Sequence, residues 1–176
     1  QNPIEQEGTY PLPEAQLDRF LVQITVPHPD RDTERAILLA TTGAEEAEAH
    51  AVFSPEDLIA AQSLLRRMPV GEAVMEAILD LVRSFRPDDA NAPEIVREAV
   101  AWGPGPRAAQ ALMLTVRARA LLSGRYAPDI TDVAAMALPV LSHRMALGFA
   151  ARAQGQSLDG LISDITARIT RTEAAA

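Results

Sequence analysis

The side chains that could carry chemistry in this sequence are limited by two absences. All 16 basic residues are arginine, so the chain has no lysine, and it has no cysteine. The missing lysine excludes, for this chain alone, Schiff-base chemistry and a phosphate-binding loop that depends on a lysine amine. The missing cysteine excludes disulfides, thiol catalysis, iron–sulfur clusters and zinc sites with cysteine ligands. Arginines and the abundant carboxylates remain as candidates.

The histidines and serines form no pattern typical of a catalytic or metal site. His28, His50 and His143 lie far apart in the sequence, and none has a partner at the spacing of metal ligands. No Gly-x-Ser-x-Gly motif, which is typical of serine hydrolases, occurs in the chain. We therefore expect surface or capping histidines, no metal site, and little support for a stand-alone enzyme.

Charge is distributed unevenly along the chain, whose formal net charge is −8. This charge disfavours nonspecific binding to nucleic acid or to anionic membranes. Residues 101–176 nevertheless carry eight arginines against five acids, and Arg107 lies in the first turn of a predicted helix, a position that favours an anion over a cation. The most apolar stretch, 133–151, is interrupted by Pro139 and Arg144, so no membrane span is expected there.

The elements that position these residues are predicted to be mainly helices, because apolar residues recur at helical spacing between start and stop signals. The predicted helices cover about residues 14–20, 30–41, 54–68, 72–86, 94–101, 106–123, 131–141 and 157–169. Capping is expected from Asp30, Ser54, Thr131 and Ser157, and Gly124 should end the helix before it.

One segment reads as a strand. Apolar and polar residues alternate over Phe20–Val26, many of them β-branched, and Pro27 ends the pattern. A single strand has no partner of its own, so its sheet must lie elsewhere. We therefore expect residues 1–27 to be poorly ordered or to pair with another chain.

The first twenty residues resemble the MoxR branch of the AAA+ ATPases. The resemblance extends through the loop that begins at Asn2, the turn Pro11–Ala15 and the run Leu17–Phe20, and it continues more loosely to the C-terminus. The later matching segments are Gly103-Pro104-Gly105-Pro106-Arg107-Ala108, Ile130-Thr131-Asp132-Val133 and Val140-Leu141-Ser142-His143-Arg144. One departure is Gly105, where the family more often has Ser or Thr.

The resemblance implies a mainly α fold with two parts. Residues 1–50 would be the end of the α/β nucleotide-binding core, a remnant of one helix, one strand and one helix. Residues 51–176 would form the helical AAA+ lid bundle with a C-terminal helix. The P-loop and the Walker B acids of the family would lie before Asn2, so the isolated chain is expected to be inactive.

Three site residues follow from the resemblance. Asn2 would be sensor 1, an amide that can donate to a phosphate and orient the attacking water. Arg19 would be the arginine finger that reaches a neighbouring subunit's nucleotide, and Arg107 would be sensor 2, which contacts phosphate in cis. Without the motif, Asn2 would be a turn residue, Arg19 a local ion pair with Asp18 or Glu14, and Arg107 a solvated arginine.

The resemblance also implies a function for the complete protein. It would be a cytoplasmic ATPase that uses ATP and Mg²⁺ for chaperone-like assembly or metal insertion and that assembles as a hexameric ring. A von Willebrand factor A-type protein is the expected partner, without nucleic acid or membrane insertion, and neither ATP nor Mg²⁺ is expected to be held by this chain alone. Two alternatives are the ATPase subunit of a magnesium-chelatase-like complex and a non-enzymatic helical interaction module in which Asn2, Arg19 and Arg107 are structural.

Overall fold

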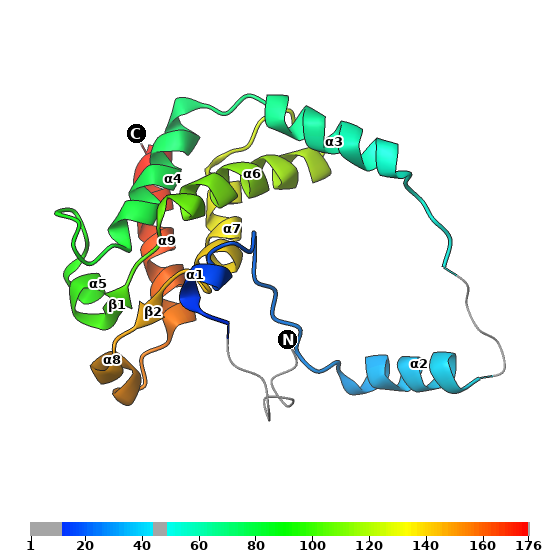
Figure 1. Ribbon diagram of the computed structural model, residues 1–176, viewed down its shortest axis with the longest axis horizontal. Coiled ribbons are helices and arrows are strands. Elements are labelled where there is room, and N and C mark those ends of the chain that lie inside the picture. The colour runs from blue at the N-terminus through cyan, green and yellow to red at the C-terminus, as the bar shows by residue number, and fades with distance from the viewer. Residues whose placement is uncertain (1–11, 44–48, 176) are drawn as a thin grey trace. The chain divides into compact units, whose positions relative to one another are not determined.

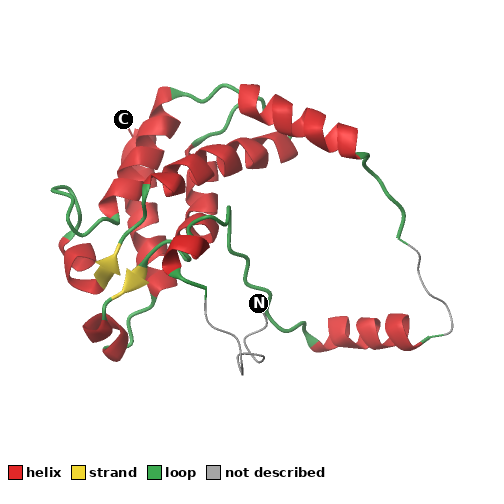
Figure 2. Cartoon of the chain, in the orientation of Figure 1, coloured by secondary structure: helices red, strands yellow, loops and turns green. Residues whose placement is uncertain are grey.

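The computed structural model describes residues 12–43 and 49–175, and these residues are mainly helical (Figures 1 and 2). This confirms the expected fold class. The helices are α1 Glu14–Leu17, α2 Arg31–Thr42, α3 Pro55–Arg67, α4 Glu72–Ser84, α5 Glu94–Ala99, α6 Pro106–Leu122, α7 Ile130–Leu141, α8 Phe149–Ala153 and α9 Leu158–Ala175. The strands are β1 Val100–Trp102 and β2 Ala146–Leu147. No helix in the described ranges combines the length and apolar character that a membrane crossing requires.

The chain divides into two compact units, residues 1–23 with 65–176, and residues 24–64. The core of the larger unit lies where α4, α6, α7 and α9 pack together (Figure 1). Each of these helices contributes fully buried aliphatic side chains, among them Ile78, Leu112, Val133 and Ile162. Each such side chain stabilises the fold by about 1.5–3 kcal/mol relative to leaving it exposed. The large buried set is typical of an independently packed bundle.

A short antiparallel ribbon joins distant parts of the larger unit. β1 pairs with β2, with Val100 opposite Leu147 and Trp102 opposite Ala146 (Figure 2). The chain then passes Gly103 close to the end of α4, where a Cβ atom would lie 2.2 Å from the carbonyl oxygen of Phe85. Only glycine permits this approach, which fixes the path into the start of α6.

The helix ends follow the expected local signals with one exception. The Asp30 carboxylate accepts from the backbone N–H of Thr33 at 2.8 Å, so it caps α2 as predicted. Thr131 does not cap α7, because Asp129 accepts from the backbone N–H groups of Thr131 and Asp132 and forms a capping box with Asp132. The prediction was two residues off because Asp129 is an equally good cap that begins the helix earlier.

The strand expected over Phe20–Val26 is not present. The segment bends at Phe20 and Leu21 and then continues as irregular chain without strand pairing in the described residues, and the Gln23 N–H donates to the Pro139 carbonyl oxygen of α7 at 2.8 Å. Phe20, Ile24 and Val26 are exposed. Alternation alone cannot form a strand, because the backbone needs a partner strand to complete its hydrogen bonds. The regular structure of residues 12–43 is therefore helical.

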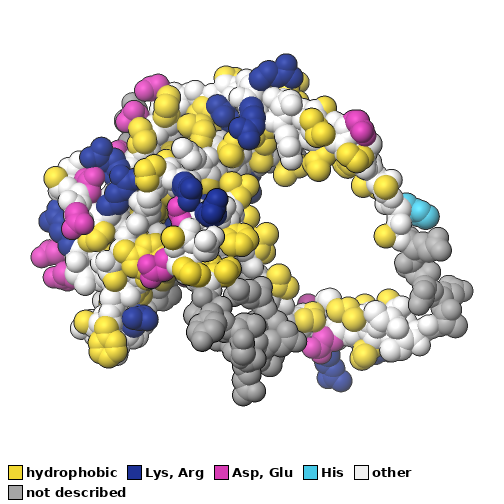
Figure 3. Space-filling model, in the orientation of Figure 1, with side chains coloured by type: hydrophobic (Ala, Val, Ile, Leu, Met, Phe, Trp, Pro, Cys, Tyr) yellow, Lys and Arg dark blue, Asp and Glu magenta, His cyan; other side chains and the backbone are white. Residues whose placement is uncertain are grey.

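The smaller unit, residues 24–64, contains α2 and most of α3. Neither helix has a buried residue, although α2 carries Ile37, Leu38 and Leu39 and α3 carries Leu58 and Ile59. All five side chains are exposed. Figure 3 shows hydrophobic side chains on the surface of both helices. The compact units thus divide the chain near residues 23 and 64, whereas the expected domain boundary lies near residue 50.

Candidate functional site

A hollow of about 300 Å³ in the larger unit brings together arginines from three parts of the sequence. Its lining comprises Asp18, Arg19, Leu21, Arg107, Gln110, Ala111, Leu114 and Arg144. The first three follow α1, the next four lie on α6, and Arg144 follows α7. With three guanidinium groups and one carboxylate, the hollow is positively charged and suits an anionic group.

Arg107 is placed by the start of α6. Pro106 occupies the first helical position and Gly105 precedes it in an extended conformation, without a side-chain cap. The first backbone N–H groups of a helix lack intrahelical acceptors, so the start of α6 adds a partial positive charge beside Arg107. The side chain of Arg107 is 53% exposed, which leaves its guanidinium accessible to a ligand.

Arg144 is the buried anchor of the hollow, with a side chain that is only 2% exposed. Its guanidinium donates to the carbonyl oxygens of Asp18 at 3.2 Å, Leu21 at 3.2 Å and Val140 at 2.6 Å, and also to that of Phe20. It also pairs with the Asp18 carboxylate, with 3.2 Å between Nε and Oδ1. Burial lowers the pKa of Arg144, but these acceptors compensate the buried charge.

Asp18 links the two arginines. Its Oδ1 lies 3.2 Å from Arg144 Nε, and its Oδ2 lies 3.4 Å from Arg107 Nη1. The Asp18 side chain is 28% exposed, so one oxygen faces the buried anchor and the other faces the open hollow. The segment that carries Arg19 is thereby fastened to both α6 and the end of α7.

His143 lies beside Arg144 on the buried side of the hollow. Its Nε2 lies 2.8 Å from Arg144 Nη1 and 3.1 Å from the Phe20 carbonyl oxygen. The Phe20 carbonyl oxygen can only accept and the Arg144 guanidinium can only donate, so a neutral ring satisfies one of these two Nε2 contacts at a time. The other ring nitrogen, Nδ1, is buried without a partner in the described part of the chain. Burial, and secondly the charge of Arg144, lower the pKa of His143, so the ring is neutral at pH 7.

The predicted site residues have different outcomes. Arg19 and Arg107 line the same hollow, although they are far apart in sequence. Asn2 lies outside the described residues. The sequence analysis did not identify Asp18 and Arg144 as site residues. The available signal was that Arg144 lies in the most apolar stretch, 133–151, because a buried arginine needs hydrogen-bond acceptors that compensate its charge.

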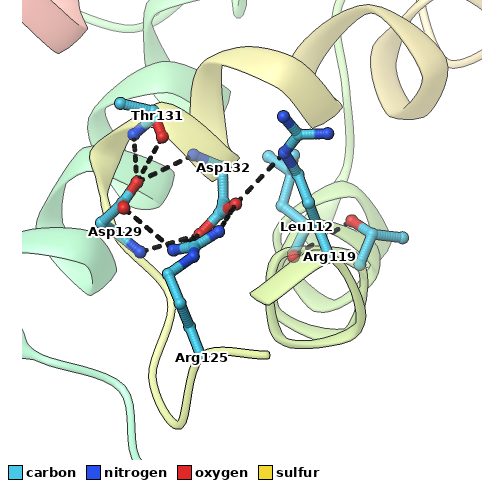
Figure 4. A network of polar contacts seen from close by, with 7 residues as sticks. Leu112, Arg119, Arg125, Asp129, Thr131 and Asp132 are labelled. Carbon is cyan, nitrogen blue, oxygen red and sulfur yellow. Dashed lines mark hydrogen bonds and ion pairs between the residues drawn. The ribbon is translucent and has the colours of Figure 1, made fainter. Parts of the chain in front are cut away.

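A second arginine–aspartate network lies where α6 leads into α7 (Figure 4). The fully buried Asp132 accepts from Arg125 at 2.6 and 2.8 Å and pairs with Arg119 at 3.2 Å. Burial alone would raise the pKa of Asp132, but the Arg125 and Asp129 N–H donors and the two arginine charges hold that pKa below its usual value. Arg119 is thus an ion-pair partner of Asp132 that stabilises this connection.

The residues around the first hollow fit phosphate groups but not a metal ion. Guanidinium groups match the charge and geometry of phosphate oxygens. Across residues 12–43 and 49–175, no three His, Asp or Glu side chains are grouped so that they could hold a metal. If nucleotide and Mg²⁺ bind, the described residues would contact the phosphates, and the metal would need other ligands.

Two family models match the chain. The AAA lid domain matches residues 92–165, and the ATPase family associated with various cellular activities matches residues 1–22. The first match includes Arg107 and Arg144, and the second includes Asp18 and Arg19. The arginine hollow therefore lies where the two matched regions meet.

Curated relatives point to the same family. Chaperone MoxR1 of Mycobacterium tuberculosis is 34% identical over 165 residues, which is 94% of this chain and 44% of that protein. The uncharacterized protein YeaC of Bacillus subtilis is 32% identical over 96% of this chain and 50% of its own length. Protein MoxR of Paracoccus denitrificans is 32% identical over 83% of this chain and 46% of its own length. The chain thus spans about half the length of the curated relatives that it matches.

A solved structure has the same fold. A candidate ATPase from Cytophaga hutchinsonii matches 96% of this chain and 51% of its own chain, with a TM-score of 0.88 and 29% sequence identity. Together with the lid-domain match and the MoxR relatives, this agreement shows that the chain belongs to the MoxR family of AAA+ ATPases, of which it contains the lid region and the segment that precedes it.

Proposed function

We propose that this chain supplies the phosphate-sensing arginines and the lid of a MoxR-type ATPase that couples ATP binding and hydrolysis to chaperone-like assembly of other proteins. The observation that carries the proposal is the shared hollow, which brings Arg19 and Arg107 together around a buried anchor. An exposed cationic hollow at a helix start suits a phosphate better than it suits an apolar ligand.

Each arginine has a distinct proposed role. Arg107, on the lid and beside the first N–H groups of α6, would bind a phosphate of the nucleotide held by its own subunit. Arg19 is exposed and would act as the arginine finger on a neighbouring subunit's nucleotide. Because both line one hollow here, a contact in cis is the competing possibility, and the experiment below distinguishes the two. Asn2 keeps its proposed role as sensor 1.

The remaining assignments are proposals of the same kind. Residues 1–50 would belong to the nucleotide-binding core and residues 51–176 to the lid. ATP supplies the phosphoryl bond that is hydrolysed, and Mg²⁺ would be held outside the described residues. A cytoplasmic hexameric ring and a von Willebrand factor A-type partner complete the proposed assembly, with metal insertion as one possible outcome for the client. The name of Chaperone MoxR1 supports the chaperone part.

The proposal is tested in the full-length protein that carries this chain. Arg19→Ala should lower the rate of ATP hydrolysis by about a thousandfold while nucleotide binding is retained, because a finger acts on the transition state. Arg107→Ala should weaken nucleotide binding by roughly tenfold or more, since it removes a charge-assisted hydrogen bond. Arg152→Ala, an exposed arginine on α8, is the matched control and should change neither quantity.

Mixing subunits distinguishes action in trans from action in cis. An Arg19→Ala subunit is combined with a subunit that cannot hydrolyse its own nucleotide but retains Arg19. Recovered hydrolysis supports a finger in trans, whereas no recovery at any ratio assigns Arg19 to its own subunit. Unchanged hydrolysis in both single variants would instead favour the helical interaction module, in which the Asp18–Arg107 pair is structural.

A further inference from the structure

The Asp18 carboxylate occupies a position that the proposed phosphate contact would need. Its Oδ2 lies 3.4 Å from Arg107 Nη1, inside the hollow that holds the candidate phosphate-binding arginines. A guanidinium that is paired with a carboxylate has fewer donors available for a phosphate. Asp18 and an incoming phosphate therefore compete for Arg107.

The two arginines that pair with Asp18 differ in burial and in the number of their other hydrogen bonds. Arg144 is buried, and its other donors are committed to the backbone carbonyl groups of Asp18, Phe20, Leu21 and Val140. Arg107 is 53% exposed, and α6 alone carries it. The Arg144 side keeps the carboxylate in place, whereas the Arg107 side chain is free to turn toward another anion.

The energetic balance favours exchange when phosphate arrives. An ion pair this exposed to water contributes little to stability, because solvent screens it. A phosphate group carries more negative charge and more acceptor oxygens than a carboxylate, and Arg can bind it through two donors. We infer that Asp18 is the exchangeable partner of Arg107: it holds the guanidinium in the absence of ligand and releases it when a phosphate enters the hollow.

This inference rests on the proposed function and adds a property to it. Because Arg144 holds the Asp18 carboxylate in place, a negative charge stays at the hollow and lowers the affinity of the hollow for weakly charged anions. Removing that charge should strengthen phosphate binding, which is the opposite of what a purely structural residue would do on mutation.

The experiment measures the affinity of the full-length protein for a slowly hydrolysed ATP analogue by titration calorimetry. Asp18→Asn keeps an oxygen that can accept from Arg144 Nε but removes the charge, so we expect binding about two- to fivefold tighter. Arg107→Gln should weaken binding, and in that background Asp18→Asn should have no further effect. Asp164→Asn, an exposed carboxylate on α9 outside the hollow, is the matched control for a general change of charge.

The outcomes separate the inference from the proposed function. Unchanged affinity in Arg107→Gln would overturn both, since Arg107 would then not meet phosphate. Weaker binding in Arg107→Gln without tighter binding in Asp18→Asn would overturn the inference alone. Equal tightening by Asp18→Asn with or without Arg107, or by Asp164→Asn, would also overturn it. Should the Asp18→Asn chain not fold, Asp18→Ser removes the same charge and keeps an acceptor oxygen for Arg144.

Discussion

Two networks in this molecule each join one aspartate to two arginines, but the buried member differs. Around Asp132 the carboxylate is fully buried, and Arg119 and Arg125 are partly exposed. In the Asp18 network the buried member is Arg144, whereas the Asp18 carboxylate and the Arg107 guanidinium are partly exposed to solvent. A buried carboxylate with all of its acceptors used is fixed, whereas one that faces water on one side can change partners. The same residue types therefore build a structural connection in one place and an adaptable site in the other.

The largest expected effect tests this difference by making the same change in both networks. Asp132→Asn places amide donors against the Arg125 guanidinium and the Asp129 N–H, neither of which can accept. We expect a loss of about 2–4 kcal/mol in the free energy of unfolding, measured by urea denaturation. Asp18→Asn should cost less than Asp132→Asn in the same assay, because its pair with Arg107 is exposed to water and the Asn oxygen can still accept from Arg144 Nε. Equal losses in the two variants would contradict the comparison.

A smaller and more local effect is expected from Arg144→Met. This change leaves the backbone carbonyl groups of residues 18, 20 and 21 without their donor, so the segment after α1 should detach from α7 more often. The amide of Gln23, which donates to the Pro139 carbonyl oxygen, should exchange its hydrogen about 10–100-fold faster. Amides in the middle of α4, such as that of Ile78, serve as the internal control. Equal acceleration there would mean that Arg144 supports the whole bundle.

The smallest expected effect is a pH dependence that belongs to the Asp18 network. Burial, and secondly the charge of Arg144, hold the pKa of His143 below 6.5, so the unfolded chain binds a proton more readily than the folded chain does. The stability from His143 is thus fully present above pH 6.5 and is lost as the pH falls through the folded-state pKa. The midpoint of thermal unfolding should drop between pH 7.5 and 5.5, and His143→Gln should reduce that drop. His28→Gln, at an exposed position, should leave it unchanged.

The sequence predicted the local features of this fold well because their causes are local. The Asp30 cap acts on Thr33, and the Ser54 hydroxyl accepts from the backbone N–H of Asp57 at 3.1 Å. Gly124 has a φ of +72°, a backbone conformation that glycine adopts without strain because it has no Cβ atom. Such signals span a few residues, so they can be found without knowing the fold.

Features that depend on distant partners were not predicted. Arg144 contacts Asp18 across 126 residues of sequence, and nothing adjacent to either residue indicates the pair. The ribbon of β1 and β2 is too short for an alternation pattern, whereas the alternation over Phe20–Val26 lacks a partner strand in the described residues. The resemblance to a family assigned Arg19 to a neighbouring subunit's nucleotide and Arg107 to phosphate in cis, so their place in one hollow was not predicted.

The ribbon that leads into α6 also gives the molecule a built-in optical probe. Trp102 is the single tryptophan of the chain, and it lies half-buried in β1. Gly103 follows it against the end of α4, and Arg107 comes five residues after Trp102. Because indole emission depends on solvent contact, the intrinsic fluorescence excited at the tryptophan band reports on this one junction. A change in emission on ligand addition would therefore localise the response to the entry of α6 without any introduced label.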